Sequence, residues 1–171
     1  MLPNVPVPFI DAHSHLHGFP HDAWETLGTS GIMATVISCG NPHEHREVFE
    51  KAPNLVDVRR LWDHPIKLAP LVETRHGFQV FIAVGISSMT RVDGWEELVQ
   101  LMPSYLKMPR VVAVGEAGLD PIQYFGLHWP LEEQKKALEE QVRVAKECGT
   151  PFVLHTPKLK DQKDYAQPLS T

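Results

Sequence analysis

The distribution of apolar residues along the chain predicts alternating strands and helices. Five short segments are mostly apolar and rich in β-branched residues; they lie at residues 9–13, 31–40, 79–86, 111–116 and 151–155. Strands that are apolar throughout, rather than at alternate positions, are typical of parallel sheets whose two faces are both covered. The pattern therefore predicts five parallel strands.

The segments between the strands carry helical patterns. Residues 95–106 place apolar side chains on one face, and Pro103 can introduce a kink there. That face is formed by Trp95, Leu98, Val99, Met102 and Leu106. The stretch 41–77 is expected to be helical in part, without clear boundaries in the sequence.

The clearest helix is predicted at residues 130–148. Pro130 suits the first turn of a helix, and Gly149 followed by Pro151 stops it. One apolar face is expected to consist of Leu131, Leu138, Val142, Ala145 and Cys148.

Parallel strands that alternate with helices leave two main folds, the doubly wound sheet and the (β/α)8 TIM barrel. A dinucleotide-binding doubly wound sheet needs Gly-x-Gly-x-x-Gly after its first strand, but this chain has His13 and His15 there. The barrel is therefore favoured. Because such a barrel needs about 250 residues, we expect residues 1–171 to form a single domain with about the first five β/α units, truncated at its C-terminus.

Composition and charge exclude several classes of protein. Apolar residues make up 43% and charged residues 22%, as in ordinary globular proteins. The net charge of -5 and pI of 6.0 argue against a protein that coats nucleic acid or an anionic membrane through bulk charge. There is no visible signal peptide, no apolar run of about 20 residues, and no disulfide framework from Cys39 and Cys148. We expect a cytoplasmic protein without a membrane partner.

Four potential metal ligands lie where predicted strands end, which is where TIM barrels place functional residues. His13 and His15 end the first strand, Glu116 the fourth and His155 the fifth. Residues two apart on an extended segment point the same way, so both imidazoles can reach one ion. Each residue alone has a more ordinary interpretation, as a surface or hydrogen-bonding side chain. Three strand ends that each offer a ligand favour a catalytic metal site.

The motifs around these residues resemble those of a known family. Residues 11–16 (DAHSHL) are similar to the opening motif of the amidohydrolase superfamily. Residues 114–120 (VGEAGLD) resemble the Gly-Glu-x-Gly-Leu-Asp motif of TatD-like metal-dependent hydrolases, and residues 151–157 (PFVLHTP) look closest to the archaeal-type branch of TatD-related hydrolases. The resemblance covers most of the chain.

The resemblance implies a role for each ligand. His13 and His15 would bind one divalent ion, Glu116 would bridge two, and His155 would bind the second. The metals would activate a water for attack on a phosphodiester, in a small molecule or a nucleic acid. Imidazole and carboxylate ligands suit zinc, and also manganese, iron or nickel, with magnesium less favoured.

The sequence departs from the family in two respects. The third-strand motif usually continues Gly-Ile-His-Pro, with a substrate-side histidine, whereas residues 85–88 read GISS. The family's later ligands, a histidine on the sixth strand and a proton-accepting aspartate on the eighth, have no counterpart in the 171 residues. No residue is therefore assigned as catalytic.

Other polar residues are weaker candidates. Asp11 and Asp120 could hydrogen-bond a ligand histidine or contact substrate, but they could equally start a strand and cap a turn. Lys158 could meet a phosphate, although a solvated charge run is the more frequent reading. His43 and His45 offer an extra site, or surface histidines of a helix.

Three functions remain open. The first is metal-dependent hydrolysis of phosphodiesters. The second is an amidohydrolase acting on a cyclic amide or nucleobase, a class that usually carries a carboxylated lysine or histidine on the middle strands, where this chain has Glu116. The third is an inactive, truncated metal-binding remnant, which the missing strands favour. Five parallel strands leave two open edges, and the chain could self-associate through them.

Overall fold

A computed structural model describes residues 7–16, 21–40, 52–121 and 128–156. Within these residues strands and helices alternate, and all five predicted strands are confirmed. The elements are β1 (Phe9–Ser14), α1 (His21–Thr29), β2 (Ile32–Ser38), α2 (Leu55–His76), β3 (Gln79–Val84), α3 (Trp95–Tyr105), β4 (Val111–Gly118), α4 (Leu131–Cys148) and β5 (Phe152–His155).

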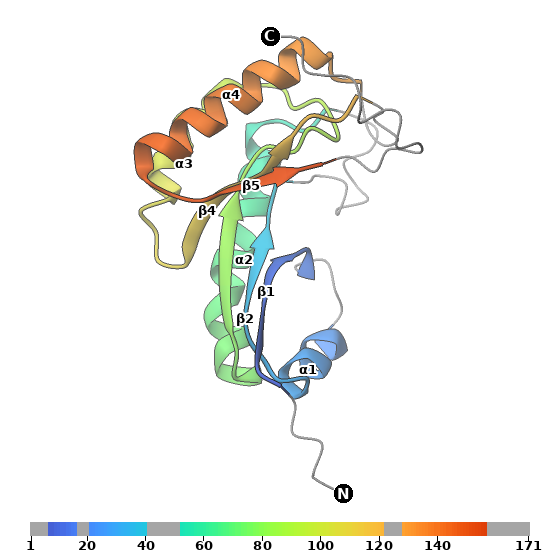
Figure 1. Cartoon of the computed structure of the whole chain (residues 1–171), viewed down its shortest axis with the longest axis vertical. Coiled ribbons are helices and arrows are strands. Elements are labelled where there is room, and N and C mark those ends of the chain that lie inside the picture. The colour runs from blue at the N-terminus through green and yellow to red at the C-terminus, as the bar shows by residue number, and fades with distance from the viewer. Residues whose placement is uncertain (1–6, 17–20, 41–51, 122–127, 157–171) are drawn as a thin grey trace, which may run out of the picture.

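The five strands form one sheet in the order of the chain, β1-β2-β3-β4-β5, and every neighbouring pair is parallel. The sheet is strongly curled, and each helix packs against the next one along the chain (Figure 1). A strand order that never reverses is that of a (β/α) barrel, because a doubly wound sheet changes direction at its first strand. The predicted fold class is confirmed, with five strands of a TIM-type barrel and the four helices between them.

The hydrophobic core lies between the outer face of the sheet and helices α2, α3 and α4. Side chains from alternate positions of the strands meet the apolar faces of the helices there. The predicted face of α3 is confirmed, with Leu98, Val99 and Met102 buried and Trp95 and Leu106 packed beside them. The largest fully buried apolar residues are Trp62, Trp129, Phe78, Ile37, Ile82, Ile86, Leu98 and Met102.

Helix α2 supplies the boundaries that the sequence left open. It begins with a capping box, in which the Asn54 side chain accepts from the N–H of Asp57 and the Asp57 carboxylate accepts from the N–H of Asn54. It ends at Gly77 in the left-handed conformation, with φ 78°. Pro65 and Pro70 both lie inside the helix, which explains why the sequence pattern did not reveal one continuous element.

The predicted apolar face of α4 is wrong in part. The ends agree, since the helix follows Pro130 and stops at Gly149, but Leu131, Val142 and Cys148 are exposed. Ala145 is buried as predicted, and the other buried residues of the helix are Gln134, Ala137, Gln141 and Val144. A count of apolar residues passes over glutamine, which is buried here because main-chain partners satisfy its amide group.

The two end strands of the sheet each have one neighbour among the described residues. Strand β1 exposes Phe9 and Ile10, which are 42% and 65% exposed, and β5 exposes Leu154, which is 59% exposed. Apolar side chains on an unpaired strand edge favour association with another strand. Separately, no helix in the described ranges has the length and hydropathy that crossing a bilayer requires.

Candidate metal centre

Side chains from separate strands meet at the carboxyl end of the sheet. His13 belongs to β1, His15 is the first residue after that strand, and Glu116 lies in β4. The Nε2 atoms of the two histidines are 3.1 Å apart. They lie 3.4 and 3.5 Å from Oε2 of Glu116. The structure thus joins three of the four sequence-predicted ligands into one cluster whose ligand atoms all lie within 4.8 Å of one another.

These separations suit a single metal ion. With metal–ligand bonds of about 2.0–2.1 Å in a tetrahedral site, neighbouring ligand atoms lie roughly 3.4 Å apart. The three atoms of the cluster come close to that arrangement. The histidine side chains are more exposed than Glu116, so the cluster opens toward solvent on the histidine side. Three protein ligands and an open side are the form that catalytic metal sites take.

His155, at the end of β5, is the fourth predicted ligand and contacts Glu116 from the other side. Its Nδ1 lies 2.5 Å from Oε1 of Glu116, so the two carboxylate oxygens face different histidines. The Nε2 atom of His155 is buried and has no hydrogen-bond partner among the described residues. A buried nitrogen without a partner is costly and calls for a ligand. The described residues nevertheless offer fewer ligands for a second ion than for the first.

The contact between Glu116 and His155 shifts both pKa values. Burial by itself raises the pKa of Glu116, but hydrogen bonds from His15 and His155 and the nearby imidazole charges outweigh it, and the pKa lies far below its usual range. The hydrogen bond to Glu116 raises the pKa of His155, against the opposing effect of burial. The carboxylate is therefore ionised, as a metal ligand must be.

Ser38 is a site residue that the sequence reasoning missed. Its buried Oγ, at the end of β2, lies 3.1 Å from Nδ1 of His13. When Nδ1–H donates to this hydroxyl, Nε2 keeps the lone pair that a metal needs. Asp11, the predicted partner of a ligand histidine, accepts instead from the main-chain N–H of His13, at 3.1 Å. Ser38 could have been proposed from the sequence, because it lies near the end of the predicted strand that follows the strand of His13.

Ser14 explains why the two histidines face the same way. It lies between them in sequence, and its side chain is buried on the other side of β1. Its Oγ is 2.7 Å from Oγ1 of Thr35, and it donates to the main-chain oxygen of Val36 at 3.3 Å. These contacts fasten the end of β1 to β2 and leave both imidazoles facing Glu116.

Glycines let the strands approach closely beneath the cluster. A Cβ atom on Gly85 would lie 2.6 Å from Cα of Gly115, and one on Gly40 would lie 2.8 Å from the main-chain oxygen of Glu116. A Cβ atom on Gly118 would collide with the main-chain oxygen of His155. Real Cβ atoms do not approach other atoms so closely, so the position of Glu116 depends on the absence of side chains at its neighbours.

The turn after β3 is largely buried. Ser87 and Ser88 are each 2% exposed, and Ser87 stands at the position where the family resemblance implies a substrate-side histidine. The N–H of Ser87 donates to the main-chain oxygen of Gly40 at 2.9 Å, and Trp62 Nε1 donates to that of Gly85 at 3.0 Å. These hydrogen bonds connect the turn to Gly40, which follows β2, and to Trp62 in α2.

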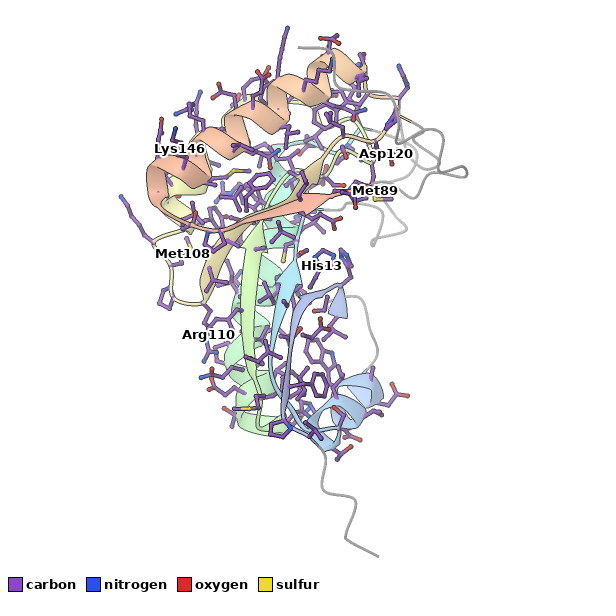
Figure 2. The ribbon with its side chains drawn as sticks, viewed as in Figure 1. His13, Met89, Met108, Arg110, Asp120 and Lys146 are labelled. Atoms are coloured by element: carbon purple, nitrogen blue, oxygen red, sulfur yellow. The ribbon has the colours of Figure 1, made fainter. Side chains whose placement is uncertain are left out.

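Asp120 lies two residues beyond β4 and is buried. The hydrogen bond to Glu116 has the largest effect on the pKa of His155 and raises it, whereas burial lowers it. The charge of Asp120 raises this pKa by a smaller amount. Figure 2 shows Asp120 and His13 on the side of the molecule where the strands end, away from Arg110, which precedes β4. Lys158, His43 and His45 lie outside the described residues.

Comparison with known proteins identifies the family. The sequence model of the family described as TatD related DNase matches residues 10–170, and the chain belongs to this family. An uncharacterized metal-dependent hydrolase of Methanocaldococcus jannaschii is 32% identical over 155 residues, which are 91% of this chain and 55% of that protein. An uncharacterized metal-dependent hydrolase of Bacillus subtilis is 30% identical over 148 residues, covering 85% of this chain and 49% of that protein.

A solved structure supports the fold. The crystal structure of a TatD family hydrolase from Entamoeba histolytica superposes with a TM-score of 0.58 at 18% identity, over 91% of this chain and 52% of that chain. At this level of identity the likeness concerns the fold alone. The chain spans about half the length of the curated relatives that it matches.

Proposed function

We propose that this protein is a metal-dependent hydrolase that cleaves phosphodiesters. The observation that carries the proposal is the cluster of His13, His15 and Glu116, whose three ligand atoms stand at the separations of a single metal site. Zinc is the first candidate, and manganese, iron or nickel would also suit these ligands, with magnesium less favoured. His155 and the second oxygen of Glu116 would take part in binding a second ion.

Each residue of the site has a task in this proposal. A bound divalent ion would lower the pKa of a coordinated water toward neutrality, so that hydroxide is available for attack. His13 and His15 supply two neutral nitrogen ligands, and Ser38 keeps the His13 ring in position. Glu116 supplies negative charge, and His155 holds the orientation of its carboxylate.

The phosphodiester is supported by the family description, TatD related DNase. The names of the two relatives go no further than metal-dependent hydrolase. The net charge of -5 means that a phosphate would have to be attracted by the site and its metal rather than by the protein surface. The family description therefore favours a small-molecule or nucleic-acid phosphodiester as the substrate.

Assays on the purified chain, loaded in turn with zinc, manganese, iron, nickel and magnesium, test this function. We expect hydrolysis of bis-p-nitrophenyl phosphate or of an oligonucleotide, and no turnover of a panel of dihydropyrimidines. Turnover of cyclic amides alone would identify an amidohydrolase instead. A metal-loaded chain that hydrolyses neither class would contradict catalysis and support a non-catalytic metal-binding role.

We propose that the polypeptide of 171 residues self-associates through its strand edges. Leu154 on β5 and Ile10 on β1 are exposed apolar residues on edge strands, and such edges pair readily with other chains. Light scattering coupled to size exclusion should therefore show dimers or larger species, and Leu154→Lys should reduce them. Val142→Lys, on the exposed side of α4, is the matched control. A monomer with a sharp cooperative thermal transition would show that the edges do not associate.

We further propose that the protein acts in the cytoplasm. The sequence has two cysteines, of which Cys39 is buried and Cys148 is exposed. Two cysteines make no disulfide framework, and proteins without such a framework are usual in a reducing compartment. Cell fractionation with a specific antibody tests the proposal, and recovery from an extracytoplasmic fraction would contradict it.

A further inference from the structure

Two glutamines of α4 occupy places where apolar residues are expected. Gln134 and Gln141 are seven residues apart, so they lie on the same face of the helix. Each is 1% exposed. A buried carboxamide is costly unless its donors and acceptor are all used, so the contacts of these side chains indicate what they are for.

Gln141 holds the turn after β3 by both main-chain groups of one residue. The N–H of Ile86 donates to Oε1 of Gln141 at 2.8 Å, and Nε2 of Gln141 donates to the main-chain oxygen of Ile86 at 3.3 Å. The second amide hydrogen reaches the main-chain oxygen of Ala137 at 3.1 Å. The side chain thus pairs with Ile86 as a neighbouring strand would.

Gln134 forms the same pair of main-chain hydrogen bonds with the turn after β4. The N–H of Asp120 donates to Oε1 of Gln134 at 2.8 Å, and Nε2 of Gln134 donates to the main-chain oxygen of Asp120 at 3.2 Å. Its other amide hydrogen reaches the main-chain oxygen of Trp129 at 2.8 Å. Ile86 and Asp120 each lie two residues beyond the last residue of their strand, so one helix holds equivalent positions of two consecutive turns.

The turns after β3 and β4, which Gln141 and Gln134 bind, lie close to the candidate ligands. Gly85, beside Ile86, is packed so closely on Gly115 that a Cβ atom on Gly85 would collide with the main chain of Gly115, and Gly115 precedes Glu116. Asp120 lies two residues after Gly118, where a Cβ atom would collide with the main-chain oxygen of His155. A displacement of either turn would therefore move Glu116 or the close contact between the ends of β4 and β5.

We propose that Gln134 and Gln141 are positioning residues, which place Glu116 and Asp120 by fixing the main chain of the turns after β3 and β4. The proposal rests on the proposed function in so far as Glu116 is a metal ligand. It differs from a general contribution to core stability, because it predicts a change at the site that equal destabilisation elsewhere in α4 does not cause.

The test compares Gln134→Leu and Gln141→Leu with Val144→Ala. Val144 is a buried apolar residue of the same helix, 2% exposed, and its truncation destabilises the core through a cavity without removing a hydrogen bond to either turn. Three quantities are measured on each full-length variant: the midpoint of thermal unfolding, the imidazole NMR shifts of His13 and His155 in metal-free protein, and the zinc affinity by competition with a chelator. If Gln141→Leu does not fold, Gln141→Glu, which keeps the oxygen that accepts from Ile86, replaces it.

All three variants are expected to unfold at lower temperature. Only the glutamine variants should shift the His155 resonances, and they should weaken zinc binding by about tenfold or more, the usual effect of losing an outer contact of a metal site. Glutamine variants that match Val144→Ala in ring shifts and in affinity would overturn the proposal. If the parent chain binds no metal, the proposed function fails, and the metal-free ring shifts alone decide whether the glutamines position Glu116.

Discussion

Glu116→Ala is expected to abolish binding of the proposed second metal ion and to weaken binding of the first. One carboxylate faces His13 and His15 with one oxygen and His155 with the other, so no other described residue substitutes for it. The loss of affinity should exceed the roughly 10–100-fold cost of losing an outer-shell partner of a metal site. Metal content of the purified variant by mass spectrometry checks this result.

Glu96→Ala, which removes an exposed carboxylate in the first turn of α3, is the control and should keep the parent metal content. The Glu116 substitution should also lower the pKa of His155, because the hydrogen bond that raises it is lost. An NMR titration of the imidazole measures that change. If the stoichiometry of Glu116→Ala equals that of the parent, Glu116 is a structural residue and the proposed metal site is wrong.

Gly85→Ala is expected to destabilise the protein by at least about 3 kcal/mol, at the upper end of what an added methyl group costs in a packed core. The new Cβ would lie 2.6 Å from Cα of Gly115. Because main chain rather than a flexible side chain blocks it, β3 or β4 must move, and Glu116 moves with them. Denaturant unfolding measures the loss of stability, and the zinc affinity of the folded fraction should fall as well.

Gly94→Ala is the matched comparison. Gly94 has φ 75°, and a Cβ there would meet no atom within 4 Å, so only the left-handed conformation opposes alanine, at about 1 kcal/mol. Equal losses of stability in the two variants would mean that the close approach of β3 and β4 is not required for folding.

Much of the fold could be predicted because its signals are local. A strand that is apolar on both faces and a helix that is stopped by Gly149 are visible in a few neighbouring residues. The alternation of these elements, together with His-x-His in place of a glycine motif, was enough to favour the barrel over a doubly wound sheet. The same locality placed His13 and His15 on one side of β1, since side chains alternate along a strand.

The candidate ligands were predictable as a set because a parallel barrel collects the ends of its strands at one mouth. What the sequence could not supply is the geometry between strands. The division of the two Glu116 oxygens between different histidines depends on the register of β1, β4 and β5 and on glycines that bring their main chains together. These are contacts between residues far apart in the chain.

The sequence by itself therefore determined the class of elements, their order and the identity of the candidate ligands. Only the tertiary structure decided that Ser38 rather than Asp11 meets the His13 ring, and that α4 buries Gln134 and Gln141 while it exposes Val142. The physical reason is that polar side chains are sorted by their hydrogen-bond partners. Those partners belong to strands and turns that come together only when the chain has folded.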